Sequence, residues 1–362
     1  MKIMFIIHSL DKRGGAETVL MYLANHFAAT SKHQVILTTL TNKNIILKLN
    51  KNIKLFRSTK YADKGKNNYL HIVYQIQDIK YAITNNQPDI IISFITGVNI
   101  LTTIAAKLTN TPIIISERSS YDYGVNNKLW SLLRRYTYPF ANTLVLPTNT
   151  EKNKYHYVKQ IDIIPNPLKS LNQITNTVPR EKLILAVGTL HFVKGFDMLI
   201  DAFNEANLDD WKLIILGEGV LREELEKQIT KLTLNNFISM PGHTTDTEPF
   251  YRKASIFVLS SRSEGYPNVL CEAMSYGCAS IAFDCPTGPK DIINHESNGL
   301  LVEAENIFKL SESISKLVKD KRLREEISNN APNILEKLHI NHISKLWEKS
   351  MTKVIKSAII NE

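Results

Sequence analysis

The sequence predicts an α/β protein of two domains, each containing a parallel β-sheet that is covered by helices on both faces. Short β-branched apolar runs alternate with amphipathic stretches along the chain. Continuous apolar runs of this length, separated by helical segments, are typical of parallel strands buried on both faces. The chain has 362 residues, more than one core usually accommodates, so two domains of about 150 to 200 residues are expected.

Nine apolar runs are the predicted strands, five in the first half of the chain and four in the second. They span residues 2–7, 34–40, 89–94, 112–116, 143–147, 183–188, 212–217, 255–260 and 279–283. Residues 163–182 contain Asn-Pro breaks and no apolar period, which is typical of a linker. The expected parts are an N-terminal domain over residues 1–165, a C-terminal domain over 166–340, and an amphipathic helix within 341–362 that packs back on the N-terminal domain.

The positive charge of the chain lies in its first half. Residues 1–165 contain 21 Lys and Arg against 9 Asp and Glu, a net of +12, whereas residues 166–362 contain 23 against 26, a net of −3. Such asymmetry predicts contact with an anionic surface or substrate, such as membrane lipid, phosphate or nucleic acid. The alternative is a solvated face in a composition rich in Lys and Asn.

Two basic stretches refine this expectation. Residues 43–66 contain eight Lys or Arg and one acidic residue, Asp63. Residues 126–140 mix aromatic and basic side chains, namely Trp130, Tyr136, Tyr138, Arg134 and Arg135. This mixture suits a membrane interface with anionic lipid, although the second stretch also fits an ordinary core-packing helix. No nucleic-acid recognition module accompanies either stretch, so no nucleic-acid partner is expected.

The remaining composition indicates a reduced, aqueous compartment. The three cysteines are spaced by seven residues, without a CxxC pair, and are expected to be buried thiols. The opening apolar run is too short for a secretory signal, and no run approaches 18 apolar residues. We therefore expect a cytoplasmic protein that is at most peripheral to a membrane.

Ligands of such sheets bind where strand ends meet helix starts, and three glycine-containing loops are candidates. Gly14 and Gly15 follow the first strand and open a helix, where free amides can meet an anion. Gly188 ends a later strand, and Lys194 next to a glycine turn can place a charge on a phosphate. Gly217 lies in a further turn into a helix. Tight turns and a solvated lysine are the alternative explanations, and the absence of GxGxxG argues against a dehydrogenase.

The fourth loop, residues 263–277, contains two carboxylates eight positions apart. Pro267 suits the first position of a helix, so Glu264 would lie before that helix and Glu272 on its second turn. Their separation of about 10 Å exceeds the roughly 5 Å of a retaining glycosidase pair. They are expected to hold two ends of one long ligand, or, alternatively, to be favoured only by the helix dipole. The amides of the helix start would hold a diphosphate, at Asn268, Val269 and Leu270.

The chain resembles family 4 glycosyltransferases over essentially its whole length. The resemblance is carried, in the family's order, by GGAETV, ISERSS, IIPNP, VGTLHFVKGFDMLI, LGEGVLREELE, SRSEGYPNVLCEAMSYG and CPTGPKDIINHESNGLLV. It implies the GT-B fold of two Rossmann-like domains, with the donor bound in the C-terminal domain and the acceptor in the N-terminal one. It also implies retention of anomeric configuration without a metal or another cofactor.

The resemblance assigns roles to individual residues. Glu264 would face the donor-sugar hydroxyls and Lys194 the diphosphate, as the catalytic pair, and Glu272 would hold the ribose. The further expected donor-binding residues are Gly188, Thr189, Arg262, Gly265, Tyr266, Asn268, Val269, Leu270 and Gly217. Gly14 and Gly15 would form the phosphate or acceptor loop.

Two positions depart from the family pattern. Thr189 stands where the family usually has an arginine, so the charge of the leaving group would rest on Lys194, the helix amides and Arg262. Many relatives have a histidine where this chain has Glu117, which is followed by Arg118. We place these two residues on the acceptor side.

The expected function is that of a retaining glycosyltransferase acting at the inner face of the cytoplasmic membrane. It would move a sugar from a nucleotide-sugar donor, expected to be a UDP-sugar, to a growing, lipid-linked glycan of bacterial type. A nucleotide-sugar epimerase of the same fold and a nucleotide-sugar-binding protein without turnover are the alternatives.

Overall fold

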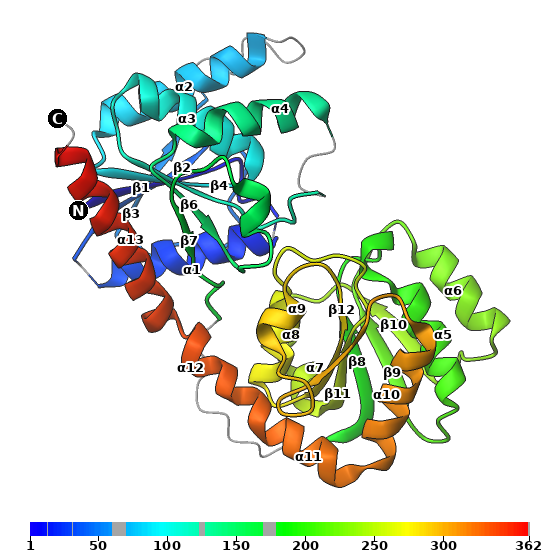
Figure 1. The fold of residues 1–362 in the computed structure, drawn as a ribbon. Helices are drawn as coiled ribbons and strands as arrows, with labels where there is room; N and C mark the ends of the chain where they lie inside the picture. The colour runs from blue at the N-terminus through cyan, green and yellow to red at the C-terminus, as the bar shows by residue number, and fades with distance from the viewer. Residues whose placement is uncertain (13, 31, 60–69, 123–126, 169–178, 361–362) are drawn as a thin grey trace. The chain divides into compact units, whose positions relative to one another are not determined.

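The computed structural model describes the chain except for residues 13, 31, 60–69, 123–126, 169–178 and 361–362 (Figure 1). Contacts divide it into an N-terminal unit, Met1–Lys169 with Leu338–Glu362, and a C-terminal unit, Ser170–Lys337. The expected boundaries after residues 165 and 340 lie four and three residues from these divisions. Half of the expected linker, residues 169–178, lies outside the described residues.

The N-terminal unit contains a seven-stranded parallel sheet in the order β3-β2-β1-β4-β5-β6-β7. Its strands are β1 Lys2–Ile7, β2 Gln34–Thr39, β3 Ile53–Arg57, β4 Ile90–Phe94, β5 Ile113–Ser116, β6 Thr143–Leu146 and β7 Ile161–Ile163. Along β1, Ile3 and Phe5 contribute to one core, whereas Met4 and Ile6 contribute to the other. This alternation follows the two-residue period of a strand, and it explains why β1 is apolar at every position after Lys2.

Helices cover both faces of this sheet. They are α1 Gly15–Ala29, α2 Leu70–Asn86, α3 Thr96–Leu108, α4 Lys128–Thr137 and α13 Ile340–Ile360, with short 3-10 turns η2 Tyr138–Phe140 and η3 Lys152–Tyr155. Helices α1 and α13 pack on one face (Figure 1). The indole of Trp347 on α13 is fully buried and stacks on Phe94, with ring centroids 6.1 Å apart. The C-terminal helix therefore belongs to the core of the N-terminal unit.

The C-terminal unit contains a six-stranded parallel sheet in the order β10-β9-β8-β11-β12-β13. Its strands are β8 Glu181–Val187, β9 Lys212–Leu216, β10 Ile238–Gly242, β11 Ala254–Leu259, β12 Ala279–Asp284 and β13 Leu300–Glu303. Its helices are η4 Phe192–Lys194, α5 Phe196–Ala206, α6 Arg222–Lys231, α7 Glu248–Lys253, α8 Asn268–Ser275, α9 Pro289–Ile292, α10 Ile307–Lys319, α11 Lys321–Asn330 and η5 Ala331–Asn333. Helix α12, Ile334–Leu338, ends at the unit boundary.

The strand order of the C-terminal unit positions its ligand edge. The chain runs outward from β8 through β9 to β10, and then returns to the other side of β8 as β11, β12 and β13. The carboxyl ends of β8 and β11 are neighbours at this reversal, which is where open parallel sheets bind ligands. The fold therefore brings together the loops that contain Lys194 and Glu264.

Each of the nine predicted runs is a strand, which confirms the predicted fold class. The three cysteines are buried and free, and burial raises the pKa of Cys278 to about 11 and those of Cys271 and Cys285 to about 12. None of the described helices combines the length and apolarity needed to cross a bilayer.

Candidate active site

The loops that follow β8 and β11 pack against each other through Gly195. This residue has a φ of +62°, and a Cβ atom there would lie 2.1 Å from the carbonyl oxygen of Ser260. Only glycine fits such a close backbone approach. The Ser260 hydroxyl in turn donates to the Lys194 carbonyl at 3.0 Å. Lys194 is thus fixed beside the loop that contains Glu264.

Lys194 and Glu264 form an ion pair, with Lys194 Nζ 2.6 Å from Glu264 Oε1. Glu264 is buried, at 8% exposure, and the Lys194 side chain is 24% exposed. Ser261 Oγ donates to the same carboxylate oxygen at 2.7 Å, and the Thr287 hydroxyl donates to the Glu264 carbonyl. A carboxylate held by these partners has a defined direction, as a group that positions a substrate requires.

Arg262 is held by carboxylates in this structure. Its guanidinium makes two hydrogen bonds to Asp197, at 2.9 and 2.6 Å, and Nε donates to Glu305 at 3.1 Å. It also donates to the Phe192 carbonyl at 2.7 Å. Arg262 thus links the start of α5 and the turn that contains Lys194 to the loop after β11. Its expected contact with a phosphate stays a prediction.

Glu272 lies on the second turn of α8, as its spacing from Pro267 predicts. The hydroxyl of Tyr251, on α7, lies 3.1 Å from Glu272 Oε2. Tyr251 is fully buried, and its pKa is raised well above the ordinary value by burial and by the Glu272 carboxylate. The hydroxyl therefore stays protonated and orients the carboxylate, which is itself half-buried.

The start of α8 differs in part from the expectation of three free amides. The Asn268 N–H donates to the Tyr266 carbonyl at 2.9 Å, and the Leu270 N–H donates to the Pro267 carbonyl at 3.0 Å. Two of the three amides are therefore already bonded, because the helix opens with a tight turn. The third of the expected amides is the backbone N–H of Val269. Gly265 is half-buried and Tyr266 buried within the same turn.

Glycine also permits the loops after β8 and β9 to meet. A Cβ atom at Gly217 would lie 1.8 Å from the Gly188 carbonyl oxygen, and the Gly188 N–H donates to the Leu216 carbonyl at 2.9 Å. Both expected glycines thus serve close backbone packing at the ligand edge. Thr189, next to Gly188, is exposed at this edge and provides no positive charge.

Four supporting residues at this site escaped sequence reasoning: Ser261, Thr287, Tyr251 and Asp197. Ser261, Thr287 and Asp197 lie inside conspicuous motifs, but hydroxyl and acidic residues are too common there to single out. Tyr251 lies on a separate helix, 21 residues before its partner Glu272. No pattern in the sequence indicates that contact.

The expected loop of the N-terminal unit starts α1. Gly14 is the N-cap, Gly15 is the first helical residue, and a Cβ atom at Gly14 would lie 2.3 Å from Glu17 Oε2. Burial raises the pKa of Glu17. Packing against Glu17 accounts for Gly14, and the anion site expected at this loop stays a prediction.

Glu117 is buried, at 2% exposure, within the N-terminal unit. Its carboxylate accepts hydrogen bonds from the hydroxyls of Tyr138 and Thr96, the latter at 3.0 Å, and from Asn99 at 3.3 Å. Burial raises its pKa. A carboxylate enclosed in this way supports the packing of the N-terminal unit, and its expected place on the acceptor side stays a prediction.

Arg118 is buried as well. It donates to the Ile164 carbonyl at 2.9 Å and to Asn166 Oδ1 at 2.8 Å, and its guanidinium lies over the rings of Phe94 and Trp347. Arg118 thus joins β5 to the segment after β7 and to α13. Its expected place on the acceptor side stays a prediction beside this linking role.

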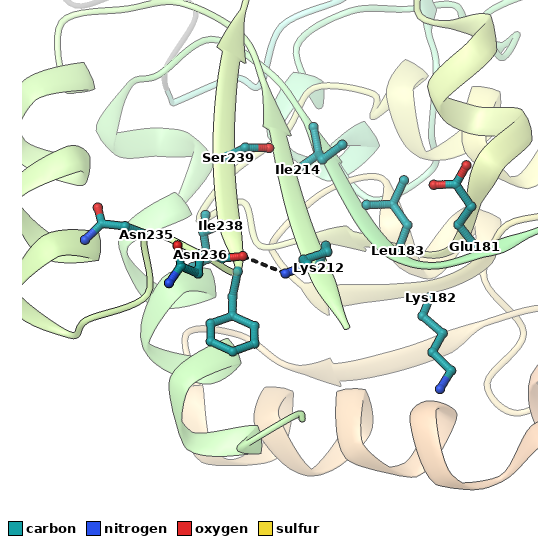
Figure 2. A pocket seen from close by; sticks show the side chains of 10 residues that line it. Glu181, Lys182, Leu183, Lys212, Ile214, Asn235, Asn236, Ile238 and Ser239 are labelled. Atoms are coloured by element: carbon teal, nitrogen blue, oxygen red, sulfur yellow. Dashed lines mark hydrogen bonds between the residues drawn. The ribbon is translucent and has the colours of Figure 1, made fainter. Parts of the chain in front are cut away.

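The opposite edge of the C-terminal sheet contains a hollow of about 320 Å³ at the amino ends of β8, β9 and β10 (Figure 2). The charged groups around it already have partners. Glu181 pairs with Lys253 and Lys182 with Asp210, and Lys212 donates to the Asn236 carbonyl at 2.6 Å. The hollow is remote from the Lys194 and Glu264 pair in the strand direction and is not a candidate active site.

Across the part of the chain that the structure describes, no group of three or more His, Cys, Asp or Glu side chains is placed to hold a metal ion. Metal independence therefore stays a prediction.

Comparisons with known proteins identify the family of this chain. The glycosyl transferases group 1 family matches residues 169–334, and Glycosyltransferase Family 4 matches residues 13–169. The chain is 31% identical to a Campylobacter jejuni protein over 98% of this chain and 99% of that protein. That relative is named GalNAc-alpha-(1->4)-GalNAc-alpha-(1->3)-diNAcBac-PP-undecaprenol alpha-1,4-N-acetyl-D-galactosaminyltransferase.

Solved structures share the fold. HepE from Anabaena, in complex with UDP, has a TM-score of 0.82 at 17% identity and covers 98% of this chain and 100% of its own. The lipopolysaccharide outer core galactosyltransferase WaaB has a TM-score of 0.77 at 21% identity, with 98% and 99% covered. The chain is thus a glycosyltransferase of the GT-B fold and belongs to glycosyltransferase family 4.

Proposed function

We propose that the protein is a retaining transferase that moves a sugar from a UDP-sugar to a lipid-linked glycan at the inner face of the cytoplasmic membrane. The observation that carries the donor half of this proposal is the Lys194 and Glu264 pair beside the start of α8. Glu272 follows on the next turn, held by Tyr251. The cation comes from the loop after β8, and the helix start and the second carboxylate come from the segment after β11.

These groups can divide one donor among them. Glu272 would accept hydrogen bonds from the ribose hydroxyls, and the start of α8 with Lys194 would face the diphosphate. Glu264 would accept from hydroxyls of the sugar. Because Lys194 contacts Glu264 directly, this arrangement sets the sugar site next to the phosphate site, where the bond from sugar to phosphate must break.

Lys194 would assist the reaction through the leaving group. Breaking the glycosyl bond leaves a nucleoside diphosphate whose negative charge grows, and a fixed cation stabilises that charge more than it stabilises the intact donor. Ser261 keeps a hydrogen bond to Glu264 when Lys194 turns toward phosphate. The carboxylate therefore keeps its direction during the exchange.

The choice of donor and acceptor draws on the relatives. HepE was solved with UDP, and the C. jejuni relative is named for a PP-undecaprenol acceptor. The N-terminal unit contains 26 Lys and Arg against 11 Asp and Glu, a net of +15. That charge suits an anionic membrane surface and a diphosphate-linked acceptor.

Two measurements test the proposal. Thermal unfolding with UDP, GDP, ADP and their sugars identifies the donor base, since a ligand at 100 times its Kd adds about 2.7 kcal/mol of stability. Release of UDP from the donor is then followed with and without a polyprenyl-diphosphate glycan, and the anomeric configuration of the product is determined. Acceptor-dependent release with retention is expected. Isomerisation of the donor alone would identify an epimerase, and binding without either reaction a binding protein.

A further inference from the structure

Helix α4 and the η2 turn after it present a row of large apolar side chains to solvent. Leu129 is 42% exposed, Leu132 53%, Tyr136 66% and Phe140 61%. Spacings of three and four residues place Leu129, Leu132 and Tyr136 along one face of α4, and Phe140 follows in the η2 turn. Figure 1 shows α4 beside α3 in the N-terminal unit.

The opposite side of α4 is firmly packed, so the exposed row has a fixed orientation. Arg134 is buried, with its guanidinium 3.6 Å from the centre of the Tyr121 ring, and it donates to the Tyr121 carbonyl at 3.1 Å. Asn127 caps the helix by accepting from the Leu129 N–H at 2.9 Å. The packing and the cap therefore hold the apolar row at a fixed position on the surface of the N-terminal unit.

The charges around this row are positive. Lys128 and Arg135 are exposed on α4, and the sequence contains no Asp or Glu between Asp122 and Glu151. A large exposed apolar patch marks an interaction site. The N-terminal unit has a net charge of +15, so a second copy of this chain would bring like charges together across this face. An anionic bilayer has the opposite charge and is complementary to the face.

We propose that this face of α4 inserts into the interface of an anionic lipid bilayer. Leu132, Tyr136 and Phe140 would enter below the headgroups while Lys128 and Arg135 bind lipid phosphates. The inference deepens the proposed function, on which it rests for the membrane-borne acceptor. The contact differs from the one expected for residues 126–140 from the sequence. Arg134 and Tyr138 are buried, so the exposed apolar row would provide the contact with lipid.

Flotation with vesicles of phosphatidylglycerol and phosphatidylcholine tests this inference. The parent protein should bind, and part of the binding should persist at about 1 M salt, where charges are screened within about 3 Å. The double variant Leu132→Ser/Phe140→Ser should partition about 100-fold more weakly, from about 10-fold for each apolar side chain withheld from the bilayer. Phe308→Ser is the matched control, because Phe308 is 65% exposed on α10 of the C-terminal unit.

A second measurement detects insertion directly. The fluorescence of Tyr136→Trp, after subtraction of the parent signal, should shift to shorter wavelength with vesicles and be quenched by brominated lipid. Phe308→Trp should do neither. Sedimentation without lipid tests whether a second copy of the chain covers this face instead. A parent dimer that dissociates in the double variant would overturn the inference. Vesicle binding by the double variant as strong as that of the parent would also overturn it.

One further experiment distinguishes a failure of the proposed function from a failure of the α4 inference. Transfer to a water-soluble acceptor analogue is measured for the same variants in the absence of vesicles. If the parent transfers no sugar to any acceptor but still inserts, the proposed function fails and the α4 surface stands. If transfer proceeds and the α4 variants bind vesicles as the parent does, the α4 inference alone fails.

Discussion

Lys194 Nζ lies 2.6 Å from Glu264 Oε1, so the two side chains with the clearest catalytic assignments already contact each other. The pair joins the loop after β8 to the loop after β11. A donor phosphate would compete with Glu264 for the same ammonium group, and a donor sugar would compete with Lys194 for the same carboxylate. Substitutions at the two positions should therefore have different kinetic signatures.

Lys194→Ala should lower kcat far more than it lowers donor affinity. The lost charge faces a leaving group whose negative charge grows in the transition state. We expect a loss of about 100-fold or more, by comparison with removal of one oriented donor at other active sites. Steady-state kinetics checks this, with Lys182→Ala at the far edge of the sheet as control. Activity within threefold of the parent would identify Lys194 as an ordinary surface lysine.

Arg262→Ala and Asp197→Ala should weaken transfer in parallel, each by about 10-fold, because both remove the same bidentate contact that holds the turn of Lys194. In a double-mutant cycle the two effects should overlap, with a coupling of about 0.5 to 3 kcal/mol in activation free energy. If Arg262 contacted the diphosphate instead, Asp197→Ala would not reproduce its effect and the two losses would add.

The fold could be predicted from the sequence where strands are buried on both faces. The four strands that the sequence did not reveal are β3, β7, β10 and β13, and all four are sheet edges. The apolar runs of these strands are interrupted or short: Lys54 and Arg57 in β3 are exposed, β7 has only three residues, and β13 has four. The hydrophobic pattern of a sequence therefore predicts the central strands of a sheet better than the edge strands.

The site could be predicted only as far as local motifs reach. Lys194, Glu264 and Glu272 lie in motifs whose loops the strand order brings to one edge. The partner of Arg262, Asp197, lies 65 residues away, and Tyr138, which encloses Glu117, lies 21 residues after it. Whether a charged side chain faces a ligand or a neighbouring side chain depends on such distant contacts, which spacing along the chain does not specify.

The stability of Glu117→Gln relative to the parent should rise with pH. Burial raises the pKa of Glu117 above its ordinary value of 4.5, so the protonated form is favoured in the folded state. The resulting stabilisation is complete below pH 4.5 and is lost as the pH rises through the folded pKa. Glutamine cannot ionise and therefore avoids that loss. Urea unfolding at acidic and neutral pH measures the difference.

Glu296→Gln is the control for this experiment, because Lys316 lowers the pKa of the exposed Glu296 and the expected slope has the opposite sign. A stability difference between Glu117→Gln and the parent that does not change with pH would contradict this prediction. It would show that the pKa of Glu117 is the same in the folded and unfolded protein.

Transfer should persist in excess EDTA. In the proposed mechanism Lys194 and the start of α8 provide the positive charge that a divalent ion provides in other transferases. Complete loss of activity in EDTA, restored by magnesium or manganese, would contradict this prediction. Thermal unfolding with EDTA separates an effect on stability from an effect on catalysis.

Glu272→Gln and Glu264→Gln should affect different parts of the donor. If Glu272 holds the ribose, Glu272→Gln should weaken both UDP and the intact donor by about 1 to 3 kcal/mol, the value of a charge-assisted hydrogen bond. Glu264→Gln should leave the affinity for UDP nearly unchanged, because UDP lacks the sugar that Glu264 would hold, but it should reduce transfer. Calorimetry with UDP and with the UDP-sugar distinguishes the two.

Tyr251→Phe and Ser261→Ala provide matched controls, since each removes one hydroxyl that orients one of these carboxylates. Tyr251→Phe should weaken UDP in the same direction as Glu272→Gln but by less, because the carboxylate remains and only loses its orientation. Ser261→Ala should follow Glu264→Gln and reduce transfer without weakening UDP. If all four variants weakened UDP equally, the two carboxylates would act on one common part of the ligand, and the proposed division of the donor between them would be wrong.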